Sequence, residues 1–201
     1  MSTPGFHFSD PASSSLSRDE VHFRQMEMRG YRRNDGLFEV EGRVVDRKPQ
    51  RFKPSIESRE FAANEPIHDI GVRILLDREL VVQAVRTFTA AAPYGECPMG
   101  GRALQSLVGT RIGPGWGKEV RSALGGARSC THLMELLMPL ATTAIQSIGP
   151  LLGPSNEAIA GEGRPGKIDS CYAYRSQGEL VRIRWPEHHR PRPRDESTDK
   201  P

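Results

Sequence analysis

The amino-acid sequence predicts an α+β protein, with an antiparallel sheet of about four to six strands and about three helices packed on one face. Three observations predict this class. Extended runs rich in β-branched and apolar residues fill the first half of the chain, tight-turn sequences join them in pairs, and helical spacing of apolar residues dominates the second half. Strand-rich sequence followed by helix-rich sequence is typical of α+β folds.

The predicted strands fall into two hairpins. A run that begins near Phe23 and a second run over 37–46 are joined by Asn34, Asp35 and Gly36. Asp-Gly supplies the positive φ angles that a tight hairpin turn needs. Residues 66–76 and 81–90 form the second pair, around a turn at 77–80, and residues 168–174 and 180–185 are expected to add a last hairpin or edge strand.

Three helices are expected after the second hairpin. The first spans 99–108, with Pro98 suited to its first turn, and the second spans about 118–124 and ends at Gly125 and Gly126. The third and longest begins after Ser129 and extends to Gln146.

Composition places these elements in one soluble domain over 20–187, between disordered tails at 1–19 and 188–201 that contain too few apolar residues to become ordered. The 28 Lys and Arg nearly balance the 25 Asp and Glu, which argues against nucleic acid as a partner. No signal peptide or membrane-spanning run is visible, so we expect a cytoplasmic protein with no membrane partner. The sequence does not decide between a monomer and a homo-oligomer.

The long predicted helix carries an unusual polar face. Five residues recur on this face at spacings of three and four: His132, Glu135, Pro139, Thr142 and Gln146. None of them is Lys or Arg, the residues usual on a solvent-exposed helix face. Such a face indicates one wall of a cavity. Glu135 lies one turn from His132 and is expected to orient the imidazole and make it more basic, as a general base requires. The alternative is a partly buried pair whose members bond to each other or cap the helix.

Two further groups of residues have the chemistry of a site. His68 and Asp69 are neighbours at the start of a strand, where only one of the two can face a given pocket. Cys97 and Cys130 precede helix N-termini, which lower a thiol pKa. Cys97, Cys130 and His132 are therefore an alternative zinc or iron–sulfur site, although the chain has no CxxC motif and most free cysteines are small buried apolar residues.

Several motifs together resemble the bacterial family catalogued as domain of unknown function 2889, over residues 22–187. They are Gly30–Leu37, Glu65–Asp69, Ala92–Tyr94 with Cys97–Pro98, Leu107–Gly109, Ile112–Trp116, and Cys130–Leu133 with Glu135–Leu137. The resemblance implies catabolism of lignin-derived or similar aromatic compounds, including lyase steps that release formaldehyde from a hydroxymethyl group. The order of elements is also similar to the iron–sulfur scaffold fold of the SufE/NifU type, with His132 in place of a third cysteine.

The leading functional hypothesis is a cytoplasmic enzyme that acts on a small phenolic or phenylpropanoid compound by acid–base chemistry, without an organic cofactor or metal. Its concrete form, suggested by the resemblance, is a retro-aldol carbon–carbon lyase that releases formaldehyde. His132 would remove a hydroxyl or phenol proton and His68 or Asp69 would assist. Tyr94 and Trp116 would hold the aromatic ring, and Thr142 and Gln146 would hydrogen-bond its oxygens. The alternatives are a metal or iron–sulfur carrier and a non-catalytic accessory protein.

Overall fold

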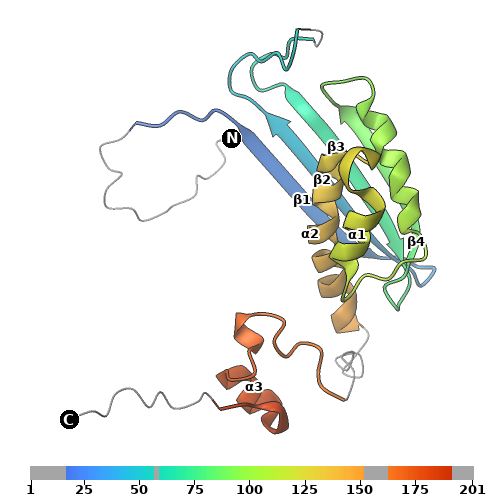
Figure 1. Ribbon diagram of the computed structural model, residues 1–201, viewed down its shortest axis with the longest axis vertical. Helices are drawn as coiled ribbons and strands as arrows, with labels where there is room; N and C mark the ends of the chain where they lie inside the picture. Colours follow the sequence, from blue (N-terminus) through green and yellow to red (C-terminus); the bar gives the residue numbers. More distant parts are fainter. Residues whose placement is uncertain (1–16, 57–58, 152–162, 192–201) are drawn as a thin grey trace.

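The computed structural model describes residues 17–56, 59–151 and 163–191, and most of the two predicted tails lies outside these ranges. Four antiparallel strands form one sheet in the order β1-β2-β3-β4, as Figure 1 shows. They are β1 (Phe23–Arg32), β2 (Phe38–Arg47), β3 (Pro66–Leu76) and β4 (Val82–Ala91). The α+β class and the two predicted hairpins are thus confirmed.

The turn between β1 and β2 forms as its sequence predicts. The backbone N–H of Arg33 donates to the carbonyl of Leu37 at 2.9 Å, and Gly36 has a φ of +86°. Only glycine adopts that angle without a steric penalty. The first hairpin is therefore determined locally, by the residues of its own turn.

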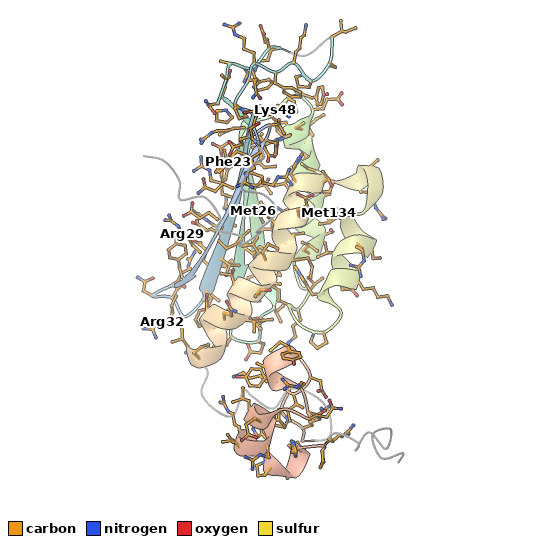
Figure 2. The ribbon with its side chains drawn as sticks, turned by 90° about the vertical axis from the view of Figure 1, so that its left-hand side faces the viewer. Phe23, Met26, Arg29, Arg32, Lys48 and Met134 are labelled. Atoms are coloured by element: carbon orange, nitrogen blue, oxygen red, sulfur yellow. The ribbon has the colours of Figure 1, made fainter. Side chains whose placement is uncertain are left out.

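The helices cover one face of the sheet. A 3-10 helix (Cys97–Leu107) follows β4, and it is succeeded by α1 (Trp116–Leu124) and α2 (Thr131–Ile148). Figure 2 shows α1 and α2 on one side of the sheet and Arg29 of β1 on the other. Among the described residues, no helix has both the length and the apolar character that crossing a membrane would require.

The core lies between α2 and the central strands. Its fully buried side chains include Val40 and Val44 of β2, Ile74 and Leu76 of β3, and Leu136, Leu137 and Leu140 of α2. Gly42 lets the helix come close, because a Cβ atom at that position would lie 3.1 Å from Cγ of Leu140. Packing of α2 on this apolar face sets where the first turn of the helix meets the sheet.

The strand register places three polar side chains in one row at the end of this face. In β2 the residues that face the helices alternate as Phe38, Val40, Gly42, Val44 and Asp46. Asp46 is paired across the sheet with Arg24 of β1 and with His68 of β3. Directly opposed residues in antiparallel strands have Cβ atoms about 4.5–5.5 Å apart. Arg24, Asp46 and His68 are therefore neighbours by topology, beside the N-terminus of α2.

Two predictions of secondary structure need correction. The hairpin or edge strand expected within 168–185 is wrong, because these residues contain a 3-10 helix (Tyr172–Tyr174) and the short helix α3 (Glu179–Arg184). The run from Leu180 to Trp185 alternates like a strand, but six residues are too few to separate the two periods. The helix predicted at 99–108 is present, but it is a 3-10 helix that already begins at Cys97.

The packing of α2 predicts a sharp contrast between two neighbouring positions. Leu140→Ala should lower the free energy of unfolding by about 2–5 kcal/mol, because it leaves a cavity under a side chain that is fully buried. Thr142→Ala, at an exposed position of the same helix, should change it by no more than about 0.5 kcal/mol. Urea unfolding of both variants tests this, and equal losses would contradict the packing described here.

Candidate functional site

A buried carboxylate organises the site. The side chain of Asp46 is only 1% exposed, yet three residues make four close polar contacts with it. Arg24 donates from Nε to Oδ1 at 2.7 Å and from Nη2 to Oδ2 at 2.9 Å, and Nε2 of His22 lies 3.2 Å from Oδ1. Burial by itself raises the pKa of Asp46, but hydrogen bonding to Arg24 and the nearby positive charge outweigh burial and lower it. Asp46 is thus a fixed negative charge.

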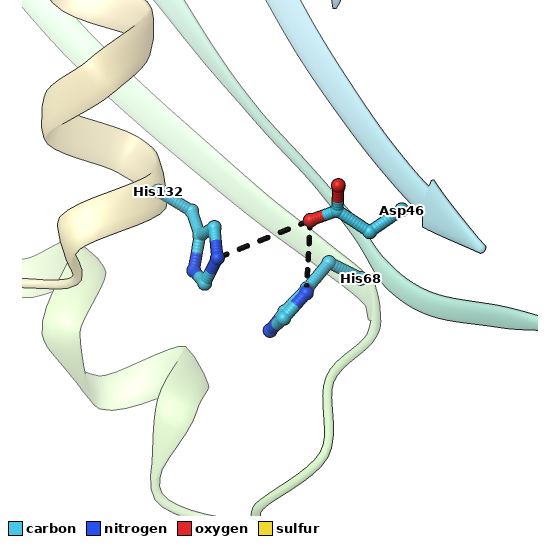
Figure 3. Close-up of side chains that lie close together, drawn as sticks. All are labelled: Asp46, His68 and His132. Atoms are coloured by element: carbon cyan, nitrogen blue, oxygen red, sulfur yellow. Dashed lines mark hydrogen bonds and ion pairs between the residues drawn. The ribbon is translucent and has the colours of Figure 1, made fainter. Parts of the chain in front are cut away.

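The third partner of Asp46 is His68, whose Nδ1 lies 3.0 Å from Oδ2 (Figure 3). An ionised carboxylate can only accept, so Nδ1 of His68 carries the proton and donates it. Burial, followed by the proximity of His132, lowers the pKa of His68 despite the attraction of Asp46. His68 is therefore mostly a neutral imidazole at pH 7, and Figure 3 shows that its second ring nitrogen, Nε2, is directed away from Asp46.

His132 projects from the first turn of α2 onto the ring of His68. The two ring centroids are 3.9 Å apart and the planes are tilted by 37°. Nε2 of His132 lies 3.9 Å from Oδ2 of Asp46, and its Nδ1 lies 3.9 Å from Sγ of Cys130. The hydrogen bond with Cys130 raises the pKa of His132 and outweighs the effect of burial.

Cys130 is the N-cap residue of α2. Burial raises the pKa of its thiol, but hydrogen bonds from His132 and from the backbone N–H groups of Leu133 and His132 reverse the shift, so that the net pKa is lowered. The two shifts bring the pKa values of the Cys130 thiol and the His132 imidazolium closer together, and so increase the share of thiolate and imidazolium relative to two isolated groups. The neighbouring histidines thus have pKa values that are shifted in opposite directions.

These groups line a cavity of about 130 Å³ at the end of the sheet. Its polar walls come from His68, His132, Cys130, Cys97 and Tyr94, and its apolar walls include Ile70 and Leu133. A wider groove of about 610 Å³ shares four of the lining residues, which are Thr89, Ala92, Pro93 and Tyr94. The site is therefore a small chamber beside a larger groove.

Two residues of the chamber and the buried carboxylate beside it have donor atoms that a metal ion can use. Within the described part of the chain, one set of three such residues has its donor atoms within 4.8 Å of one another: Asp46, His68 and His132. Both oxygens of Asp46 already accept hydrogen bonds from the guanidinium of Arg24, and a divalent cation at this carboxylate would face that positive charge. We therefore interpret the set as a hydrogen-bonded network.

The cysteines of the alternative metal site are also near the chamber. Cys97 and Cys130 both line it, together with His132. The three do not, however, form a set of closely spaced donor atoms among the described residues. The structure therefore places Cys97, Cys130 and His132 around one cavity, but not in an arrangement that would hold zinc or an iron–sulfur cluster among the described residues. The metal site stays a prediction.

The prediction that Glu135 orients His132 was wrong. Glu135 is exposed, and its Oε2 accepts a hydrogen bond from Nη1 of Arg24 at 2.6 Å, which ties α2 to β1. Cys130 and Asp46 are the neighbours that set the protonation of His132. Asp69 is also absent from the chamber, because it faces the opposite side of the sheet, where Arg43 donates to both of its oxygens at 2.7 and 2.6 Å. Of the pair at the start of β3, His68 is the one that faces the cavity.

Three of the four residues expected to bind substrate lie outside the chamber. Trp116 is buried in the core, where its Nε1 donates to the carbonyl of Leu137 at 3.2 Å. Thr142 and Gln146 are exposed. A helix rises 1.5 Å per residue, so Thr142 is about 15 Å along the axis from His132, and only the first turn of α2 reaches the cavity. Tyr94 alone lines the chamber as expected.

Asp46 and Arg24 belong to the site but were not predicted from the sequence. The signal for Asp46 was present, because it continues the inward-facing apolar register of β2 after Val40 and Val44. A carboxylate at such a position must be buried with a partner. Identifying Arg24 as that partner requires the pairing of β1 with β2, which the turn at Asp35 and Gly36 determines.

Comparison with known proteins places this site inside a family. The family described as "Protein of unknown function (DUF2889)" matches residues 22–146, more than half of the chain, and the chain therefore belongs to it. Neither the curated proteins nor the solved structures contain a match. The matched region includes Arg24, Asp46, His68, Cys130 and His132. The likeness to the SufE/NifU scaffold fold stays a prediction.

The network around Asp46 predicts a pH-dependent contribution to stability. Asp46→Ala should lower the free energy of unfolding by about 3–5 kcal/mol at neutral pH, because it leaves Arg24 and His68 without their buried partner. The folded-state pKa of Asp46 is lowered below its ordinary value of 3.8, so the contribution is complete above pH 3.8 and is lost as the pH falls toward the lowered value. Urea titrations of both proteins at a series of pH values measure it.

Glu41→Ala is the matched control for this prediction. Glu41 lies on the opposite face of β2 in a largely exposed ion pair with Arg73, and its loss should cost no more than about 1 kcal/mol. A loss at Asp46 no larger than at Glu41, or a loss that stays constant below pH 3.8, would contradict the network.

Proposed function

For this member of the DUF2889 family we propose an acid–base enzyme in which His68 is the general base and His132 the general acid. The observation that carries the proposal is the 3.0 Å hydrogen bond from Nδ1 of His68 to the buried Asp46, which leaves the basic Nε2 of His68 at the cavity. A buried carboxylate that fixes the tautomer of a histidine is a common way to prepare a general base.

Opposite pKa shifts support the two roles. Burial and the proximity of His132 lower the pKa of His68, so His68 is ready to accept a proton at pH 7. The hydrogen bond with Cys130 raises the pKa of His132, so His132 keeps its proton to a higher pH than an ordinary histidine. Neighbouring titratable groups whose environments separate their pKa values are typical of an acid and a base that act together.

The reaction that we propose is the release of formaldehyde from an aromatic compound with a hydroxymethyl side chain, in the cytoplasm and without an organic cofactor. Nε2 of His68 removes the proton of the terminal hydroxyl group, and the carbon–carbon bond to that CH₂O unit breaks. The electron pair of the broken carbon–carbon bond forms a carbon–carbon double bond to the benzylic carbon, as the benzylic carbon–oxygen bond breaks. The departing benzylic hydroxyl takes a proton from His132 and leaves as water. One proton is removed and one is supplied, so no redox partner is needed.

The dimensions of the site support this class of substrate. A chamber of about 130 Å³ is smaller than the roughly 300–1,000 Å³ of a typical ligand pocket, and it suits the short end of a molecule. The neighbouring groove of about 610 Å³ has room for an aromatic ring. Tyr94 lies at the boundary of the two and offers a ring for stacking.

The proposal predicts a bell-shaped dependence of kcat/KM on pH, measured as formaldehyde released from an aromatic 1,3-diol. The rate should rise as the pH passes through the pKa of His68, which lies below 6.5, because the base must lose its proton. It should fall as the pH passes through the pKa of His132, which lies above 6.5, because the acid must keep its proton. His68→Gln and His132→Gln should each lower kcat/KM by about 100- to 10,000-fold.

Gln146→Ala is the matched control, because it removes an exposed polar side chain from the same helix as His132. Its activity and pH profile should equal those of the wild type. Full activity in His68→Gln would refute the role of His68 as the general base. If activity were lost in a chelator and restored by zinc, a metal centre would replace the acid–base mechanism.

A further inference from the structure

Cys130 faces the same chamber as the two histidines, but the acid–base step does not use it. We propose that Cys130 is a nucleophile whose sulfur adds to the carbonyl carbon of an aldehyde in the chamber, forming a hemithioacetal. The identity of the aldehyde as formaldehyde rests on the proposed function. The nucleophilic role of the sulfur rests on the geometry around Cys130.

The surroundings of Cys130 favour a reactive sulfur. It caps the N-terminus of an 18-residue helix, whose backbone N–H groups and dipole stabilise a negative charge. Nδ1 of His132 lies 3.9 Å from its Sγ. The titratable and charged groups that other elements contribute to the site are Arg24 of β1, Asp46 of β2, His68 of β3, and Tyr94 and Cys97 from the segment after β4.

The other two cysteines provide an internal comparison. Cys171 is exposed, whereas Cys97 and Cys130 are partly buried. Among the described residues, Cys130 is the cysteine whose sulfur lies within hydrogen-bonding distance of an imidazole. The environment therefore predicts that the less accessible Cys130 reacts faster than the more accessible Cys171, the reverse of the order that exposure alone predicts.

The proposed step completes the proton balance of the site. After formaldehyde is released, His68 holds the extra proton and His132 is neutral. The thiolate of Cys130 forms a carbon–sulfur bond with the aldehyde, the π bond of the carbonyl breaks, and the oxygen takes the proton of His68. His68 is then a neutral base again. When the hemithioacetal breaks down, its hydroxyl proton passes to His132, the aldehyde leaves, and the pair of thiolate and imidazolium is restored.

Alkylation of the intact protein by iodoacetamide at neutral pH tests the reactivity of the sulfur, with each cysteine followed by peptide mass mapping. Cys130 should be labelled before Cys171, because hydrogen bonding to His132 and to backbone N–H groups lowers the pKa of the Cys130 thiol and increases its thiolate fraction. In His132→Gln the labelling rate of Cys130 should fall relative to that of Cys171, because the imidazole is lost while the backbone N–H groups of the helix remain. Faster labelling of Cys171 in the wild type would overturn the proposal without the use of any variant.

Carbon-13-labelled formaldehyde tests the covalent step directly. The wild-type protein should show the NMR signal of a hemithioacetal carbon, which Cys130→Ser loses and Cys97→Ser retains, with circular dichroism confirming that both variants are folded. A signal that persists in Cys130→Ser would overturn the inference. Formaldehyde release without an adduct would refute the role of Cys130 alone, whereas an adduct in a protein that releases no formaldehyde would support Cys130 and refute the proposed function.

Discussion

The buried carboxylate of Asp46 is the group on which the arrangement of the site depends. A charge with 1% exposure is stable in a folded protein only with partners close to it. The register of the sheet supplies Arg24 and His68 on the two flanking strands. Because Arg24 also donates to Glu135 of α2, the same network joins the helix to the sheet at the point where His132 projects. Stability and the geometry of the site therefore share one set of contacts.

The same carboxylate determines where the protons lie. It fixes Nδ1 of His68 as a donor, and so leaves Nε2 as the basic atom at the chamber. The second influence is the contact between Cys130 and His132 at the N-terminus of α2, where their hydrogen bond and the backbone N–H groups lower the pKa of the thiol, and the same hydrogen bond raises the pKa of His132. Two imidazole rings of identical chemical type thus lie 3.9 Å apart between ring centroids and differ only in their surroundings. This difference is what the proposed acid–base function uses.

Most of the fold could be predicted from local signals, and about half of the candidate site could not. Asp35 and Gly36 identify the first hairpin, and apolar spacing identifies α2, because these patterns act within a few residues. His68, His132 and Tyr94 were selected for their chemistry and do meet at the chamber. The assignment of Glu135 failed because helical spacing shows which residues share a face, but not which turn of that face reaches the cavity. Arg24 was missed because its role depends on strand pairing.

The central claim is the unequal protonation of two neighbouring histidines, and nitrogen-15 NMR of the imidazole rings tests it most directly. At pH 6.5 the account predicts that His68 is mostly neutral, with its proton on Nδ1 and none on Nε2, and that His132 mostly carries protons on both nitrogens. Assignments come from the loss of each signal in His68→Gln and His132→Gln. A proton on Nε2 of His68, or a neutral His132, would contradict the account.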